Sequence, residues 1–140
     1  MRGSGARLRW SLRSKLPRII RLALVFAAFT GLVTGSLMPG LAPSAQHGVD
    51  LGVHAAVYAM VTIFTILLVE RPLVSATVIL ALSGAIEIMQ DFVPGRSGSW
   101  SDLAANGAGI AVALGVMGVL GFSVVAVKTI SEEANARPAE

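Results

Sequence analysis

The sequence predicts an all-α membrane protein, an antiparallel bundle of four transmembrane helices with the N- and C-termini in the cytoplasm. Two features of composition support this: 54% of the 140 residues are hydrophobic and only 14% are charged. A soluble domain carries roughly 25% charged residues, because a small globule has a large surface to cover. A third observation is that the apolar residues form four stretches of about 20 residues, the length that crosses a bilayer. An ordinary soluble domain and a disordered chain are therefore excluded.

The four stretches define a transmembrane domain over residues 19–128. Prolines or charged residues mark the end of each stretch, and the connections are short enough to make neighbouring helices antiparallel. A polar C-terminal tail follows over 129–140, and 131–140 is expected to be loosely ordered. The spans are expected at about 19–38, 51–69, 73–90 and 102–127.

Residues 1–18 form a basic juxtamembrane arm. From Arg7 to Ile20 bulky apolar and basic residues alternate, which favours a helix lying in the membrane interface. If the N-terminus is cytoplasmic, all but one of the 11 basic residues lie on the cytoplasmic side, and only Arg96 lies outside. This distribution follows the positive-inside rule and predicts a multi-pass membrane protein whose N-terminus lies in the cytoplasm. Membrane lipids are the expected partners, and nucleic acid is not, because the basic block lies against the bilayer.

A secretory signal is the rival interpretation of the N-terminus. Ala42-Pro43-Ser44-Ala45 has the small residues of a cleavage site. The preceding apolar stretch is close to a full span, however, and exceeds the 7–15 residues usual for a signal core. We therefore expect a retained transmembrane helix.

Strongly polar side chains within the spans gather at the ends predicted to face outward. They occur as pairs three or four residues apart, so that each pair shares one helix face. A charged side chain facing acyl chains costs several kcal/mol, so these faces are expected to line the bundle interior or a water-filled cavity. Arg96 is expected close to Glu87 and Asp102. The pairs are His54/Tyr58, Glu87/Gln90 and Asp102/Asn106.

The candidate roles follow from the chemistry of these groups. His54 and Glu87 are the acid/base candidates if the protein is an enzyme, and a planar guanidinium at Arg96 suits an anion. The chain has no cysteine and 2 histidines, too few for a histidine-only metal site, so we expect no metal and no cofactor. The expected ligand-binding residues are Tyr58, Gln90, Arg96, Ser99, Asp102 and Asn106.

Structural roles remain open for several of these residues. Ser101 or Asp102 is a possible N-cap of the last helix, and Asn106 is a possible interhelical hydrogen-bonding residue. Direct bonding of His54 to Glu87 is a further alternative. Tyr58 and Trp100 are also candidate anchors at the membrane interface, and His47 and Asp50 are expected to be solvated in an outer loop.

Two sequence patterns resemble the VanZ-like family of small bacterial membrane proteins. The first is Asp50-x-x-x-His54-x-x-x-Tyr58. The second is Glu87-x-x-Gln90-x-Phe92-x-Pro94-Gly95-Arg96-x-x-Ser99-x-x-Asp102-x-x-x-Asn106-x-x-Gly109. The resemblance covers about residues 32–120. It departs from the family at Leu51, where a lysine is usual. The family takes its name from a teicoplanin-resistance determinant, so the resemblance implies a role at the cell envelope. It also implies that the multi-pass chain lies in the bacterial inner (cytoplasmic) membrane.

Two functions are therefore expected. The first is an outward-facing polar pocket for an anionic lipid or cell-envelope component, with no mechanism assigned. The alternative is a non-catalytic accessory subunit of a larger membrane protein complex.

Overall fold

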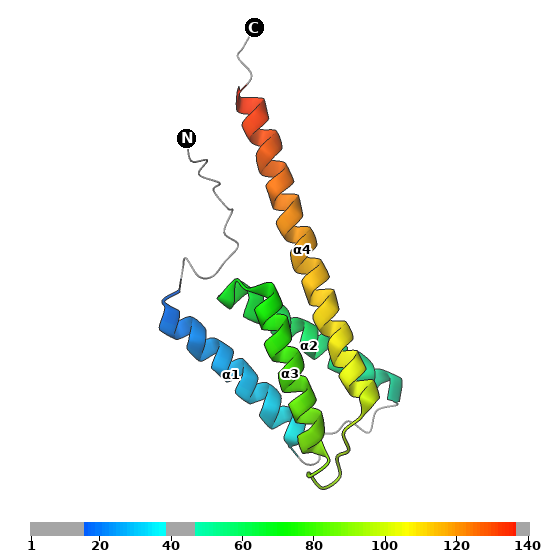
Figure 1. Ribbon diagram of the computed structural model, residues 1–140. Coiled ribbons are helices and arrows are strands. Elements are labelled where there is room, and N and C mark those ends of the chain that lie inside the picture. The colour runs from blue at the N-terminus through cyan, green and yellow to red at the C-terminus, as the bar shows by residue number, and fades with distance from the viewer. Residues whose placement is uncertain (1–15, 39–46, 137–140) are drawn as a thin grey trace.

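The computed structural model describes residues 16–38 and 47–136, with side chains for 16–38 and 50–121. Residues 1–15 of the basic arm and the Ala42–Ala45 motif lie outside the described residues, as does the side chain of His47. The described chain consists of four α-helices and contains no strand (Figure 1), which confirms the predicted all-α class. The helices are α1 (Arg18–Leu37), α2 (His47–Val69), α3 (Pro72–Gln90) and α4 (Trp100–Ala136).

Each helix contains a segment that is long and apolar enough to cross a membrane. Pro72 occupies the first turn of α3, a position where its missing N–H costs no hydrogen bond. Two helices are longer than expected. The backbone of α2 is already helical at His47, and α4 continues to Ala136. The backbone of 131–136, which was expected to be loose, is helical.

The closest helix contact lies between α2 and α4. A Cβ atom at Gly109 would lie within 3.1 Å of three backbone atoms of Ala55. No side chain fits there, so glycine permits the two backbones to approach. This crossing places the first turns of α4 directly against α2.

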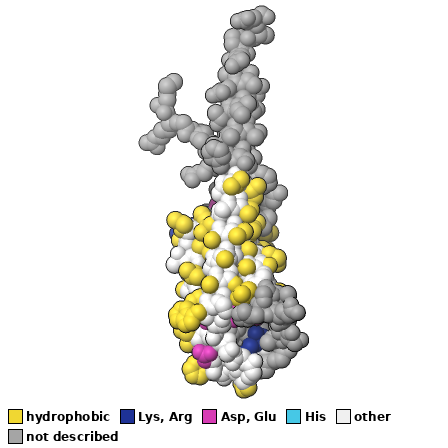
Figure 2. Space-filling view, turned by 90° about the vertical axis from the view of Figure 1, so that its right-hand side faces the viewer, with side chains coloured by type: hydrophobic (Ala, Val, Ile, Leu, Met, Phe, Trp, Pro, Cys, Tyr) yellow, Lys and Arg dark blue, Asp and Glu magenta, His cyan; other side chains and the backbone are white. Residues whose placement is uncertain are grey.

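The interior is small and the outside is apolar. The buried cluster consists of Leu32, Tyr58, Ala76, Ile79, Ile86 and Ile110, and α1 contributes only the first of these. Large apolar side chains such as Phe26 (73% exposed) and Val119 (66% exposed) point outward. Apolar side chains cover much of the described surface in Figure 2, and charged groups appear near its lower end. A helix that is apolar on all sides is typical of a membrane-spanning segment.

Hydrogen bonds identify which helix ends lie together. At one end, Arg21 Nη1 on α1 donates to the Leu68 carbonyl oxygen near the end of α2, at 2.8 Å. At the other end, Gln90 Nε2 on α3 donates to the Ser36 carbonyl oxygen of α1, at 3.0 Å. The second end also holds the first turns of α2 and α4, as the contacts described next show.

Candidate functional site

Asn106 is the centre of a buried hydrogen-bond network at this end. Its side chain is fully buried, and its Nδ2 donates to Ser83 Oγ at 2.8 Å and to Glu87 Oε1 at 3.2 Å. Its Oδ1 lies 3.0 Å from His54 Nδ1. Because the amide nitrogen is the donor to α3, Oδ1 is an acceptor, and His54 Nδ1 must carry the hydrogen. The network therefore joins α2, α3 and α4.

Glu87 uses both of its carboxylate oxygens in this network. The residue is 7% exposed. Oε1 accepts from Asn106, and Oε2 accepts from the Ser99 backbone N–H at 3.0 Å. The alternative in which His54 bonds directly to Glu87 is therefore wrong, because Asn106 lies between them. The predicted gathering of these side chains at one end of the bundle is confirmed.

Ser99 caps the first turn of α4. The Ser99 carbonyl accepts from Leu103 N at 3.1 Å, and Ser99 Oγ accepts from Ser101 N at 3.2 Å. A serine side chain that accepts from the second helical amide is an N-cap, so the proposed caps at Ser101 and Asp102 are wrong. The residue before Ser99 must be glycine, because a Cβ atom at Gly98 would overlap the Glu87 carbonyl oxygen.

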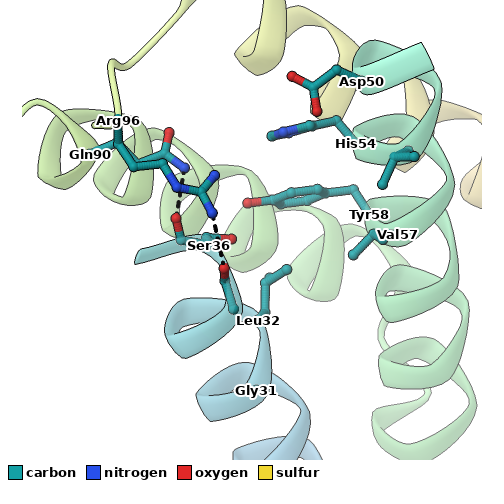
Figure 3. A pocket seen from close by; sticks show the side chains of 11 residues that line it. Gly31, Leu32, Ser36, Asp50, His54, Val57, Tyr58, Gln90 and Arg96 are labelled. Carbon is teal, nitrogen blue, oxygen red and sulfur yellow. Dashed lines mark hydrogen bonds between the residues drawn. The ribbon is translucent and has the colours of Figure 1, made fainter. Parts of the chain in front are cut away.

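A cavity of about 250 Å³ lies between α1 and α2 and is closed on one side by Gln90 and Arg96. Figure 3 shows the His54 ring and the Tyr58 hydroxyl directed into this cavity from α2, opposite Gln90 and Arg96. The contribution of α1 was not predicted. The residues that line the cavity are Gly31, Leu32, Gly35, Ser36, Asp50, Val53, His54, Val57, Tyr58, Gln90 and Arg96.

Arg96 is held by the end of α1. Its Nη2 donates to the carbonyl oxygens of Gly35 and Met38, at 3.4 and 3.3 Å. The last carbonyls of a helix have no partner within the helix, so they attract a cation. The hydrogen-bond partners of Arg96 are therefore α1 carbonyl oxygens, and its expected closeness to Glu87 and Asp102 stays a prediction. Its Nε is buried and has no hydrogen-bond partner.

The predicted ligand-binding residues do not share one cavity. Glu87 and Ser99 line a separate cavity of about 250 Å³ beside Trp100. Tyr58 is only 2% exposed and belongs to the core cluster, so the interpretation of this residue as an interface anchor is wrong. Trp100 is 87% exposed and remains available for that role.

Two aspartates approach His54 from different helices. Asp50 lies one turn before His54 on α2, and Asp102 lies in the first turn of α4. Ligating atoms of the three residues all lie within 4.8 Å of one another. The expectation that Asp50 is only solvated is wrong, because it is partly buried and lines the cavity. The signal in the sequence was its four-residue spacing from His54.

Comparison with known proteins identifies the family. The model of the family described as VanZ/LLP1 matches residues 9–121. The chain belongs to the VanZ/LLP1 family. The match confirms the resemblance and begins 23 residues earlier than the expected Leu32, so this VanZ/LLP1 chain shares part of its basic arm with the family. Neither the curated proteins nor the solved structures include a significant match to it.

Proposed function

We propose that this VanZ/LLP1 protein binds the anionic headgroup of a lipid or cell-envelope precursor in the cavity between α1 and α2. The observation that carries the proposal is Arg96 on the cavity wall, with a buried Nε that has no partner. A guanidinium has five N–H donors in a planar fork that matches phosphate oxygens. A phosphate group in the cavity would supply the acceptor that Arg96 Nε lacks.

The size and lining of the cavity support a headgroup as the ligand. Its volume of about 250 Å³ is just below the range of sites for drug-sized molecules, which begins near 300 Å³. His54, Tyr58 and Gln90 provide polar groups for hydroxyl or phosphate oxygens, whereas Val53 and Val57 provide apolar surface. This combination suits a small polar group attached to an acyl or polyprenyl chain.

We further propose that the four helices are antiparallel, with both termini in the cytoplasm and the cavity at the outer face of a bacterial inner membrane. The support is the distribution of the 11 basic residues, all of which except Arg96 fall on the opposite side in this topology. In this orientation, the cavity lies at the depth of the headgroups of the outer leaflet.

We propose binding and not catalysis, because only one of the two acid/base candidates, His54, lines the cavity. His54 lines the cavity, whereas Glu87 reaches it only through Asn106. We therefore propose that Glu87 positions Asn106, and that Asn106 fixes the ring orientation of His54. If a reaction takes place in this cavity, His54 is the residue that meets the ligand.

The test measures stabilisation of the purified protein by a short-chain phosphatidylglycerol, with the corresponding phosphatidylcholine as the neutral comparison. A ligand that binds only the folded state raises the melting temperature. We expect phosphatidylglycerol to stabilise the wild type, Arg96→Gln to lose that effect, and Arg18→Gln to retain it. Arg18 is a matched control because it is an exposed arginine at the other end of the bundle.

Equal stabilisation of the wild type and Arg96→Gln by phosphatidylglycerol would overturn the proposal. The accessory-subunit alternative predicts a different outcome. In that case, a stoichiometric partner would co-purify with the wild type and with Arg96→Gln, and neither lipid would stabilise the isolated protein.

A further inference from the structure

Three side chains that can bind a metal ion converge where α2 meets α4. They are Asp50 and His54, one turn apart on α2, and Asp102 on α4. All three are partly buried, and their ligating atoms lie within 4.8 Å of one another. Figure 3 shows the Asp50 carboxylate next to the His54 ring. A pair of carboxylates at this separation repel each other unless a positive charge lies between them.

The hydrogen bond of His54 leaves the correct nitrogen free for a metal. His54 Nδ1 donates to Asn106 Oδ1, so the lone pair is on Nε2 in the neutral ring. Histidines that bind metals almost always donate their other ring N–H to an oxygen, which fixes the ring and raises its basicity. Asn106 is itself fixed by Ser83 and Glu87. The buried network thus fixes the His54 ring through a hydrogen bond from Nδ1, in the same way that the histidines of metal-binding sites are fixed by their second ring nitrogen.

Asp102 lies in the first turn of α4, where a carboxylate is favoured by the helix dipole, but it is not the N-cap. Ser99 already caps α4, and Asp102 Oδ1 is buried with no hydrogen-bond partner. A buried carboxylate oxygen without a donor is costly, above all in a chain that spans a membrane. A cation between Asp50, His54 and Asp102 would remove both this cost and the repulsion between the carboxylates.

We infer that Asp50, His54 and Asp102 bind a divalent metal ion. Two carboxylate oxygens and one imidazole nitrogen suit Mn²⁺ or Zn²⁺ better than Ca²⁺, which takes oxygen ligands, or Cu⁺, which prefers sulfur. Ligands about 2.1 Å from a tetrahedral ion are roughly 3.4 Å apart. The ligating atoms of the three residues lie within 4.8 Å of one another, so binding would require side-chain rotations that bring them closer by up to about 1.4 Å.

Three protein ligands leave a coordination position open, the arrangement found in catalytic rather than structural metal sites. Because Asp50 and His54 also line the cavity that contains Arg96, a phosphate oxygen would occupy the open position while Arg96 binds the other oxygens. This link to an anionic ligand rests on the proposed function. Binding of the metal alone does not.

The experiment uses the full chain, purified in detergent and stripped with a chelator. Mn²⁺ binding is followed by the loss of the electron paramagnetic resonance signal of the free aqueous ion, and Zn²⁺ binding by calorimetry. We expect one ion per chain, with affinity at least tenfold lower in Asp50→Asn and in Asp102→Asn. Asp91→Asn is the matched control, since Asp91 is an exposed carboxylate at the same end of the bundle, and it should bind as the wild type does.

A folding measurement separates a lost ligand from a lost structure. Without metal, Asp102→Asn should melt at or above the wild-type temperature, because the substitution removes a repelling charge. With Mn²⁺ present, only the wild type and Asp91→Asn should gain stability. Absence of binding at millimolar Mn²⁺ and Zn²⁺, or wild-type affinity in Asp102→Asn, would overturn the inference.

Adding the short-chain phosphatidylglycerol to the same samples tests the link between the two sites. If the metal tightens phosphatidylglycerol binding in the wild type but not in Asp102→Asn, the ion and the lipid share a site. If the metal binds without any effect on the lipid, the metal site stands and the link is overturned. If the lipid binds but no metal does, the metal site is overturned and the proposed function stands.

Discussion

Replacement of Asn106 by alanine tests the buried network most directly. The substitution removes the hydrogen bonds to His54, Ser83 and Glu87, which join three helices. Interhelical hydrogen bonds in membrane proteins contribute about 0.6 kcal/mol each. Three of them correspond to about 2 kcal/mol, which is roughly a 30-fold change in the ratio of folded to unfolded protein. We therefore expect Asn106→Ala to lower the free energy of unfolding by about that amount.

The assay is reversible unfolding in mixed micelles, followed by circular dichroism as the fraction of denaturing detergent rises. Ser83→Ala removes one of the three bonds and should cost about a third as much. Val112→Ala, on α4 but 60% exposed, should change stability by less than about 0.5 kcal/mol. If Asn106→Ala and Val112→Ala unfold at the same detergent fraction, the network does not stabilise the fold and the reasoning is refuted.

Two further predictions concern the helix crossing and the sidedness of the membrane. Gly109→Ala should destabilise the protein by about 1–3 kcal/mol, the cost of overpacking, because its methyl group would meet the backbone of Ala55. In the same unfolding assay Gly115→Ala should have no such cost, since nothing lies within 4 Å of its Cβ position. The chain has no cysteine, so Ser97→Cys should react with an impermeant maleimide in intact cells and Ala139→Cys only after permeabilisation. The opposite labelling pattern would invert the proposed topology.

Part of the candidate site was predictable because helical periodicity places residues on faces. The pairs at i,i+3 and i,i+4 spacing identified the polar face of each helix, and burial of a carboxylate within a span required Glu87 to face the interior. Periodicity does not give the rotation of one helix against the next. It therefore did not reveal that Asn106 lies between His54 and Glu87.

The hydrogen-bond partners of Arg96 were not predicted for a different reason. Its partners are backbone carbonyl oxygens at the end of α1, and no sequence pattern marks which helix end presents them. The prediction that Asp50 is only solvated was wrong because Asp50 was assigned to a loop. In the structure, α2 begins at His47 and places Asp50 on the same helical face as His54. The expectation of no metal rested on the number of cysteines and histidines and did not consider this aspartate, which is why the proposed metal site was not among the predictions.

The sequence by itself determined the number of apolar helices, the approximate extent of the apolar segment in each, and the end at which their polar residues collect. It could do so because span length and helical spacing are local properties of the chain. Only the tertiary structure decided which of those residues meet. The close approach of α2 and α4 at Gly109 brings Asp102 to Asp50 and His54, and contacts between helices depend on axial rotation and on backbone atoms common to all residues.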